Sequence, residues 1–334
     1  MPKLTDTARK LALFGLLGGM VAASTIVNRR VPLVPALAAR RVDFLGKRSC
    51  FLSCYIADEA LGVPLLLIHS INAAASAYEM KPLFEAYRRQ RPVYALDLPG
   101  FGYSERTQRE YSPELYAAAI LDALDFIGQP CDVIALSLSS EFAARAALQS
   151  QAIRSLSFIS PTGFAERNAQ QSQDDDAIRL QIPPLGTLVE ISRDEIYNVL
   201  ANPILSRTLY NLLTTEPSIR YFLAQSFKGA LNDGLAEYSW TTSHQEGARY
   251  APLYFLSGKL FTRRAFDTLY KNLSLPVLVL YDRDPHTSFE RLPDMLEKQP
   301  SWRARRIPNT LGLPHFERLD KVKQALDSFW ADLS

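Results

Sequence analysis

Cysteine and histidine are scarce in this sequence. Its 334 residues include three cysteines, Cys50, Cys54 and Cys131, and four histidines. Three cysteines cannot all pair, and no cysteine and histidine cluster has the spacing of zinc ligands, so a disulfide scaffold and a structural metal are disfavoured. The acidic run at residues 174–176 is more typical of a solvated loop or a helix start than of a metal site. We therefore expect three packed thiols and no bound metal.

Net charge is also small, at +2 for pH 7. This disfavours a nucleic-acid partner, because such binding normally needs a concentrated basic face. The basic side chains gather at the N-terminus, where residues 1–48 contain nine Lys or Arg against two Asp, and the remaining chain is acidic overall. With 47% hydrophobic and 22% charged residues, the chain can bury a sizeable core.

An apolar stretch at residues 11–27 lies between two basic pairs, Arg9 with Lys10 and Arg29 with Arg30. Its 17 residues fall just short of the roughly 20 that cross a bilayer comfortably. Three alternatives stay open: a membrane anchor or surface helix, a cleaved signal peptide, and a helix packed on the body of the protein. We favour an anchor in segment 1–41, with the following domain held in the cytoplasm by the larger positive excess on its side. Export after signal cleavage is the alternative localisation.

Beyond residue 41, short apolar runs alternate with helical patterns, which is typical of a parallel sheet with crossover helices. One helix is sharply bounded by Ser112 as its N-cap, Pro113 at its first position and Gly128 after its end. The predicted helices are 113–127, 138–149 and 320–333, and the predicted strands are 42–45, 50–56, 65–68, 93–96, 131–136, 155–160 and 277–281.

The alternation stops between residues 161 and 275, where the sequence is mainly helical with polar interruptions. A doubly wound sheet that is interrupted in this way favours a cap over the carboxyl ends of the strands, where open α/β sheets bind ligands. We therefore predict an α/β core at 42–164 and 273–334 and a helical cap at 165–272.

Ser137 lies where a buried strand ends at Leu136 and a helix begins at once. Such a turn exposes the hydroxyl, and the helix N-terminus favours developing negative charge. The segment resembles the nucleophile elbow of the α/β-hydrolase fold, which usually reads Gly-x-Ser-x-Gly. Ala135 and Ser139 stand in place of the two glycines. Taking Ser139 as the nucleophile would put the bulky, charged Glu141 at the second small position, so Ser137 is the better candidate.

Two further segments resemble the same family. Residues 69–72, His-Ser-Ile-Asn, are similar to the His-Gly-x turn that provides half of an oxyanion hole, with Ser70 in place of Gly. The resemblance implies that the backbone N–H groups of Ile71 and Leu138 are the oxyanion donors. Residues 97–104, Asp-Leu-Pro-Gly-Phe-Gly-Tyr-Ser, match the Asp-x-x-Gly-x-Gly-x-Ser turn of the family closely.

The family order of a catalytic triad is serine, acid, histidine. Downstream of the insertion, Asp284 with Pro285 resembles the acid-bearing turn, although that turn is one residue short, and Asp282 stays an alternative. His315, before the last helix, resembles the histidine of a Gly-x-Gly-His-Phe loop, with Pro314 replacing one glycine. His69 is expected to bond within its own turn, and His244 to be a surface or lid residue.

This resemblance implies a serine hydrolase that cleaves a carboxylic ester or related acyl bond through an acyl-enzyme, with no cofactor. Thioester, amide and carbon–carbon bonds stay open as substrates. The insertion is rich in Leu, Ile, Tyr and Phe, which modestly favours a small-molecule or lipid-like ester. The rival interpretation is an inactive binding or scaffold protein at a membrane, supported by the departures at Ser70, Ala135, Ser139 and Pro314.

Overall fold

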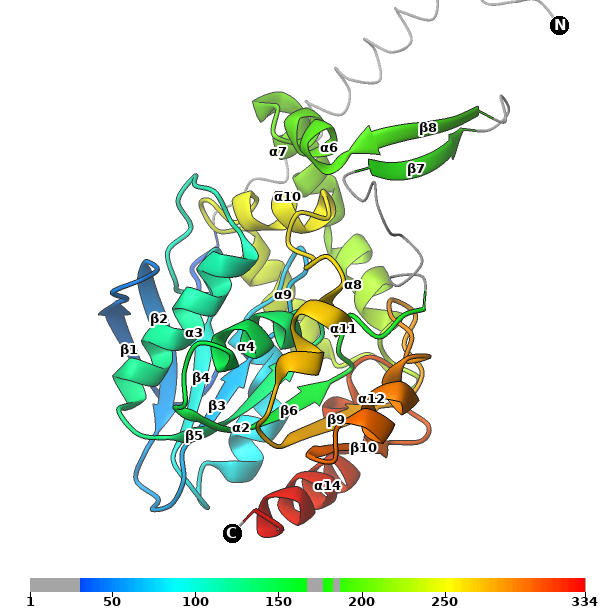
Figure 1. Cartoon of the computed structure of the whole chain (residues 1–334). Helices are drawn as coiled ribbons and strands as arrows, with labels where there is room; N and C mark the ends of the chain where they lie inside the picture. Colours follow the sequence, from blue (N-terminus) through cyan, green and yellow to red (C-terminus); the bar gives the residue numbers. More distant parts are fainter. Residues whose placement is uncertain (1–30, 167–176, 183–186, 334) are drawn as a thin grey trace, which may run out of the picture.

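The computed structural model describes residues 31–166, 177–182 and 187–333 (Figure 1). The apolar stretch 11–27 and the acidic run 174–176 lie outside the described residues. Within the described part of the chain, no helix combines the length and the apolar character needed to cross a membrane.

An eight-stranded sheet forms the centre of the molecule, with strand order β1-β2-β4-β3-β5-β6-β9-β10. β2 is antiparallel to β1 and to β4. The other strands of the sheet, β3, β4, β5, β6, β9 and β10, run parallel to one another. The strands are β1 (Arg40–Leu45), β2 (Phe51–Ala57), β3 (Leu65–Ile68), β4 (Val93–Asp97), β5 (Cys131–Leu136), β6 (Ile153–Ile159), β9 (Val277–Tyr281) and β10 (Trp302–Arg306).

Helices cover both faces of this sheet. On one face α3 (Pro113–Ile127), α4 (Ser139–Ala147) and α12 (Leu292–Lys298) contribute to one apolar core, and on the other α2 (Lys81–Tyr87) and α14 (Leu319–Ala331) contribute to a second. The short helices η1 (Ala77–Met80) and α13 (Pro314–Glu317) complete the α/β core. The ends predicted for α3 are correct: the Ser112 hydroxyl accepts from Leu115 N, and Gly128 is left-handed with φ 75°.

The structure adds elements that the sequence did not predict, among them the helices α2 and α12, the strand β10 and a hairpin in the insertion. β10 was not predicted, because three of its five residues are arginines at the outer edge of the sheet and it contains no apolar run. The insertion between β6 and β9 was predicted as mainly helical, yet it contains an antiparallel hairpin, β7 (Ala177–Ile182) with β8 (Thr187–Ser192). The acidic run at residues 174–176, directly before β7, is typical of a loop and gives no sign of a strand.

We call the segment between β6 and β9 the insert, and in Figure 1 its helices α6, α7 and α10 lie above the sheet. It packs on the core through Tyr210, whose hydroxyl donates to Ala73 O at 2.9 Å, and through Tyr238, whose ring stacks on Tyr78. Its helices are α6 (Arg193–Leu200), α7 (Pro203–Leu213), α8 (Glu216–Ala224), α9 (Asp233–Ser243), α10 (Tyr250–Leu256), α11 (Ala265–Thr268) and η2 (Tyr270–Asn272).

The three cysteines are free and buried. Burial raises the pKa of the Cys50 thiol to about 11 and that of the Cys131 thiol to about 12. Thiols with such pKa values stay protonated near neutral pH, so they act here as small packing groups.

The turn after β4 is built around one buried carboxylate. Asp97 accepts hydrogen bonds from Ala77 N and Tyr103 N, both at 2.9 Å. Gly102 has φ 52°, and a Cβ at this position would lie 1.9 Å from Asp97 Cγ. The second glycine of the Asp-x-x-Gly-x-Gly-x-Ser motif is therefore required by a close approach to Asp97.

We predict that Gly102→Ala destabilises the protein by about 2 to 4 kcal/mol, because the added methyl group displaces Asp97 and the residue is held in the left-handed region. Urea unfolding followed by circular dichroism measures this loss. Gly128→Ala is the matched control: Gly128 is also left-handed, at φ 75°, but the nearest atom to an added Cβ is 4.0 Å away. The control should lose only about 1 kcal/mol. Equal losses in the two variants would show that contact with Asp97 is unimportant.

Candidate active site

Ser137 occupies a strained turn between β5 and α4. Its φ is 55°, in the left-handed region that residues other than glycine rarely adopt. This conformation costs roughly 1–2 kcal/mol and persists only where neighbouring bonds enforce it. Here Ser137 N donates to Ile159 O at 2.8 Å on the adjacent strand, and Ser137 O accepts from Ser140 N at 3.1 Å. Within the described chain, the half-buried Ser137 hydroxyl makes no hydrogen bond.

Ser139, the other serine weighed from the sequence, is placed differently. Its side chain is fully buried, and its hydroxyl donates to His69 O at 2.6 Å. This bond ties the start of α4 to the turn that follows β3. Ser139 is therefore a structural group that joins two turns, and Ser137 is the serine whose hydroxyl is available.

The two predicted oxyanion donors lie in these same two turns. Ile71 belongs to the turn after β3, and Leu138 is the N-cap residue of α4. Across the described residues, neither Ile71 N–H nor Leu138 N–H donates a hydrogen bond. Unpaired backbone donors are rare in protein interiors, so one in each of these two turns is consistent with an oxyanion site.

His69 is fully engaged inside its turn. Its Nδ1–H donates to Ser70 O at 2.6 Å, and its Nε2 accepts from Leu98 N at 3.0 Å. Burial lowers the pKa of His69 to about 4, so the ring is neutral near pH 7. Both ring nitrogens are occupied, and His69 has no free nitrogen to act as a base.

Asp282 and Asp284, the two candidate acids, have different surroundings. Asp282 pairs with Arg306 Nε at 2.6 Å and accepts from Thr310 N at 3.2 Å. Burial alone would raise its pKa, but these bonds outweigh burial and lower it. Asp284 pairs with no lysine or arginine among the described residues, and burial raises its pKa, which the bond from His286 N and the nearby His286 ring only partly offset. The carboxylate of Asp282 is therefore occupied by bonds to Arg306 and Thr310, whereas the carboxylate of Asp284 is available to orient a histidine.

His315 lies in the short helix α13, which follows the loop after β10, and is fully buried. Its Nε2 donates to Glu79 O at 2.7 Å, and its Nδ1 has no hydrogen-bond partner in the described part of the chain. Burial lowers its pKa to about 4. Asp284 adjoins the same loop, because a Cβ at Gly312 would lie 3.0 Å from Asp284 Oδ2.

The structure thus brings the three triad candidates to one edge of the sheet without joining them. Ser137 follows β5, Asp284 follows β9 and His315 follows β10, and these strands are parallel. Among the described residues, no hydrogen bond connects Ser137, Asp284 and His315. The triad stays a prediction.

Two buried carboxylates next to these turns were missed from the sequence. Glu79 is 3% exposed and contacts the turn after β3. Glu141 is 2% exposed on α4 and accepts from Thr162 Oγ1 and from Thr262 N. Burial raises the pKa of Glu141 to about 7. In the sequence, the burial of Glu79 and Glu141 is indicated only by their position as single acids among apolar or small residues.

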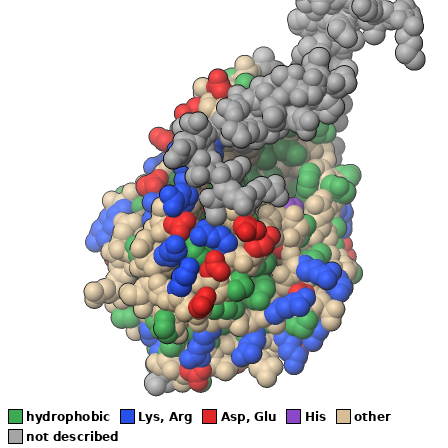
Figure 2. All heavy atoms as spheres, turned by 45° about the vertical axis from the view of Figure 1, so that its right-hand side comes forward, with side chains coloured by type: hydrophobic (Ala, Val, Ile, Leu, Met, Phe, Trp, Pro, Cys, Tyr) green, Lys and Arg blue, Asp and Glu red, His purple; other side chains and the backbone are tan. Residues whose placement is uncertain are grey.

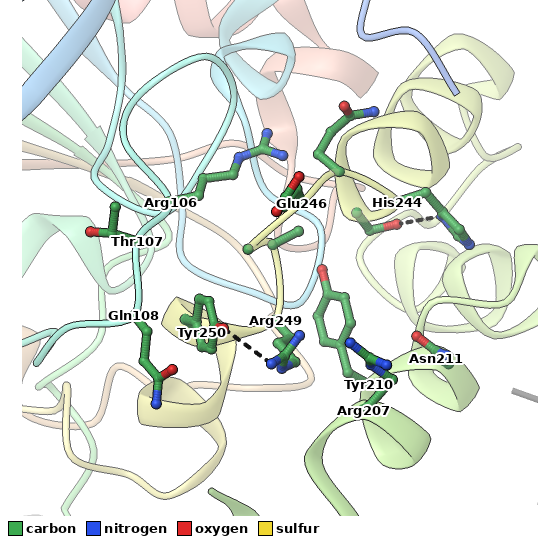
Figure 3. Close-up of a pocket in the computed structure, with 14 residues that line it drawn as sticks. Arg106, Thr107, Gln108, Arg207, Tyr210, Asn211, His244, Glu246, Arg249 and Tyr250 are labelled. Carbon is green, nitrogen blue, oxygen red and sulfur yellow. Dashed lines mark hydrogen bonds between the residues drawn. The ribbon is translucent and has the colours of Figure 1, made fainter. Parts of the chain in front are cut away.

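A cleft of about 640 Å³ opens between the core and the insert (Figure 3). Arg106 approaches it from the core, and Arg207 with Tyr210 from α7. It contains none of the predicted site residues, and it touches the site only through the bond from Tyr210 to Ala73, two residues beyond Ile71. His244, predicted as a lid residue, lines this cleft, and its Nδ1 donates to Trp240 O at 2.7 Å.

Comparisons with known proteins agree with this architecture. Residues 65–324 match the family model described as "Alpha/beta hydrolase family". No curated protein matches the sequence. A serine hydrolase involved in carbazole degradation has the same fold, with a TM-score of 0.65 at 15% identity, covering 87% of this chain and 99% of that chain.

Two other solved structures show the same likeness. A membrane phospholipase A has a TM-score of 0.64 at 16% identity, covering 98% of this chain and 95% of that chain. An esterase from Exiguobacterium antarcticum has a TM-score of 0.58 at 14% identity, covering 83% of this chain and 95% of that chain. At such identities the likeness establishes the fold and leaves the substrate to be argued from this chain.

We predict that Glu141→Gln removes a pH-dependent loss of stability. The pKa of this carboxyl is raised in the folded state. Its contribution to the free energy of unfolding is therefore complete below the unfolded pKa of about 4.5 and is lost as the pH rises through about 7. Between pH 5 and pH 8 the wild type should therefore lose about 2 to 3 kcal/mol relative to the variant. Urea unfolding of both proteins across this range measures the difference. A difference that does not change with pH would contradict the prediction.

Proposed function

Because this chain belongs to the alpha/beta hydrolase family, we propose that it is a serine hydrolase that cleaves a carboxylic ester or a related acyl bond. One observation carries the proposal: the available Ser137 hydroxyl stands on a left-handed turn at the N-terminus of α4. Two unpaired N–H groups, on Ile71 and Leu138, lie on the residues where an oxyanion hole requires them.

In the proposed reaction, Ser137 Oγ attacks the acyl carbon while His315 Nε2 takes the hydroxyl proton. The carbonyl oxygen becomes an oxyanion that accepts from Ile71 N–H and Leu138 N–H. Collapse releases the alcohol, which takes the proton from His315, and leaves an acyl-enzyme. Water then attacks the acyl carbon with the same proton route, releasing the acid and restoring Ser137. No cofactor takes part.

This route requires His315 to change its partners. A base at Nε2 needs its lone pair free, whereas here Nε2 carries the proton that is donated to Glu79 O. Turning the ring toward Ser137 and moving the proton to Nδ1 gives Nδ1–H a natural acceptor in Asp284, which adjoins the same loop. Asp282 is the weaker candidate because Arg306 already neutralises it.

We propose a lipophilic acyl group for the substrate. Figure 2 shows hydrophobic side chains lining a hollow on one face of the molecule. In addition, the insert exposes Tyr221 and Phe222 on α8 to 66% and 49%. The cleft of Figure 3, with its arginines, would then face the polar part of the substrate. A p-nitrophenyl ester series measures this preference: kcat/KM should rise from acetate to octanoate, and a steady fall would exclude a lipophilic acyl site.

The rival interpretation, an inactive binding protein, rests on departures from the family pattern. Two of those departures have defined roles in this structure. The Ser139 hydroxyl donates to His69 O, and the Ser70 hydroxyl accepts from Asn72 Nδ2 at 3.0 Å. Side chains that complete the hydrogen bonding of the two turns favour a working site over a decayed one.

We predict that a fluorophosphonate probe labels the wild type and that Ser137→Ala abolishes both the label and ester hydrolysis, because the probe reports an activated serine. No label on the wild type would reject the enzyme proposal. A label that persists in Ser137→Ala would assign the nucleophile elsewhere.

The acid is tested by a matched pair within the same experiment. Asp284→Asn should lower kcat by about 10³-fold or more, as expected when the base loses its orienting acid. Asp282→Asn should lower thermal stability through the lost Arg306 pair while keeping kcat within about tenfold of the wild type. The reverse result would make Asp282 the acid.

We also propose that residues 11–27 attach the protein to a membrane. The described chain begins at Val31, whose carbonyl accepts from Gln245 of the insert at 2.8 Å. The first described residue therefore contacts the insert, whose helix α8 exposes Tyr221 and Phe222.

We predict that the full chain sediments with membranes and resists extraction by high salt, whereas a chain lacking residues 1–30 stays in the supernatant, because the apolar stretch supplies the attachment. Mass spectrometry of the full-length product detects signal cleavage, the alternative. A truncated chain that is still fully bound to membranes would exclude residues 11–27 as the anchor.

A further inference from the structure

Glu79 is a buried carboxylate that bonds to the residues on both sides of Ile71. Its Oε2 accepts from Ser70 N at 2.8 Å, and its Oε1 accepts from Asn72 Nδ2 at 2.8 Å. Ile71, the proposed oxyanion donor, lies between these two donors in the chain. Glu79 therefore fixes the turn on both sides of Ile71, the residue whose N–H must point at the oxyanion.

The rest of the turn is hydrogen-bonded as well. Ser70 O accepts from His69 Nδ1, and Asn72 Oδ1 accepts from Ala74 N at 2.7 Å. The bond to Ser70 O fixes the peptide plane that carries Ile71 N–H, and among the described residues this N–H has no acceptor, so its hydrogen stays available for a ligand. A donor held in place before reaction costs no reorganisation in the transition state.

A carboxylate is the group that this arrangement needs. The two Glu79 oxygens face three donors, which are the Ser70 N–H, the Ser70 hydroxyl and the Asn72 amide. A glutamine would set its own NH₂ group against one of the N–H donors, because one of its two ends is itself a donor. No lysine or arginine of the described chain pairs with Glu79. Burial raises its pKa, which the bonds from Ser70 and Asn72 partly offset. A buried group with such a desolvation cost is not needed to fill space, which an apolar residue would do better.

The backbone of the same residue reaches the candidate base, since Glu79 O accepts from His315 Nε2. Substituting the side chain leaves this carbonyl in place. The oxyanion turn can therefore be perturbed without removing the contact to His315.

We propose that Glu79 is a positioning residue that aims Ile71 N–H at the oxyanion. This inference rests on the proposed serine-hydrolase function. It assigns Glu79 a role through Ile71 and gives it no contact with the substrate.

The test uses Glu79→Gln and Asn72→Asp, singly and together, in the full chain. Each single variant should lower kcat for a p-nitrophenyl ester by about tenfold or more and keep KM within about twofold of the wild type. Glu79→Gln places two donors face to face, and Asn72→Asp places two carboxylates face to face. In the double variant the amide nitrogen introduced at position 79 donates to the carboxylate introduced at position 72, while the amide oxygen still accepts from Ser70 N–H. Its kcat should return to within about threefold of the wild type. Changes in kcat that do not follow the thermal stability of the variants distinguish this role from a merely structural one.

Asp122→Asn is the matched control. Asp122 is also a buried carboxylate that accepts from two backbone N–H groups, those of Arg48 at 3.1 Å and Ser49 at 2.9 Å, but it lies in α3 under the β1–β2 turn. This variant should lower thermal stability and keep kcat. Loss of kcat in proportion to stability across all variants would overturn the assignment of Glu79.

The outcomes separate this inference from the function on which it rests. A wild type that neither hydrolyses esters nor takes the fluorophosphonate label overturns both. A labelled wild type with unchanged kcat in Glu79→Gln, or a double variant no better than the single variants, overturns the role of Glu79 alone. If Glu79→Gln does not fold, Asn72→Ala removes one donor and keeps the carboxylate, and wild-type kcat in that variant overturns the inference.

Discussion

The left-handed backbone at Ser137 is the constraint on which the candidate site depends. It lets β5 turn directly into α4, and the bond from Ser137 N to Ile159 O holds it against a strain of roughly 1–2 kcal/mol. Because the chain reverses within one residue, Leu138 N–H at the start of α4 is left without a partner. The Ser139 hydroxyl then fixes this turn to His69 of the neighbouring turn, so the two predicted halves of the oxyanion hole are braced together.

Around this constraint, buried carboxylates are satisfied mainly by neutral donors. Asp97 accepts from two backbone N–H groups, Glu79 from Ser70 N and an asparagine amide, and Glu141 from Thr262 N and a threonine hydroxyl. Burial raises the pKa of all three. Each carboxylate fixes a loop at the edge of the sheet where the parallel strands end. An acceptor with two oxygens can hold two backbone segments at once, which an apolar residue cannot do.

The sequence predicted the strands of the sheet interior and the position of Ser137 at a strand-to-helix turn, because both follow from local patterns. Buried strands are short apolar runs, and the elbow is a strand followed at once by a helix. β10 has no such pattern, since its three arginines are exposed at the edge of the sheet. The role of Glu79 could not be predicted, because it depends on a turn folding back over nine residues onto a 3₁₀ helix. Nor could the bond between His315 and Glu79 O, which joins residues 236 positions apart.

The rigid and adjustable parts of the site are therefore different elements. The elbow and the turn after β3 are fixed by short hydrogen bonds that reaction would leave intact, whereas His315 is held by one bond to a carbonyl and has a free Nδ1. Exchanging that bond for one to Asp284 replaces a neutral acceptor by a charged one, and a net hydrogen bond is worth only about 1 kcal/mol. The balance between the two positions of the ring is thus small compared with the forces that hold the turns. In the proposed reaction, a substrate that excluded water near Asp284 would strengthen the charged bond and draw the ring toward Ser137, so the base would be assembled only when substrate is bound.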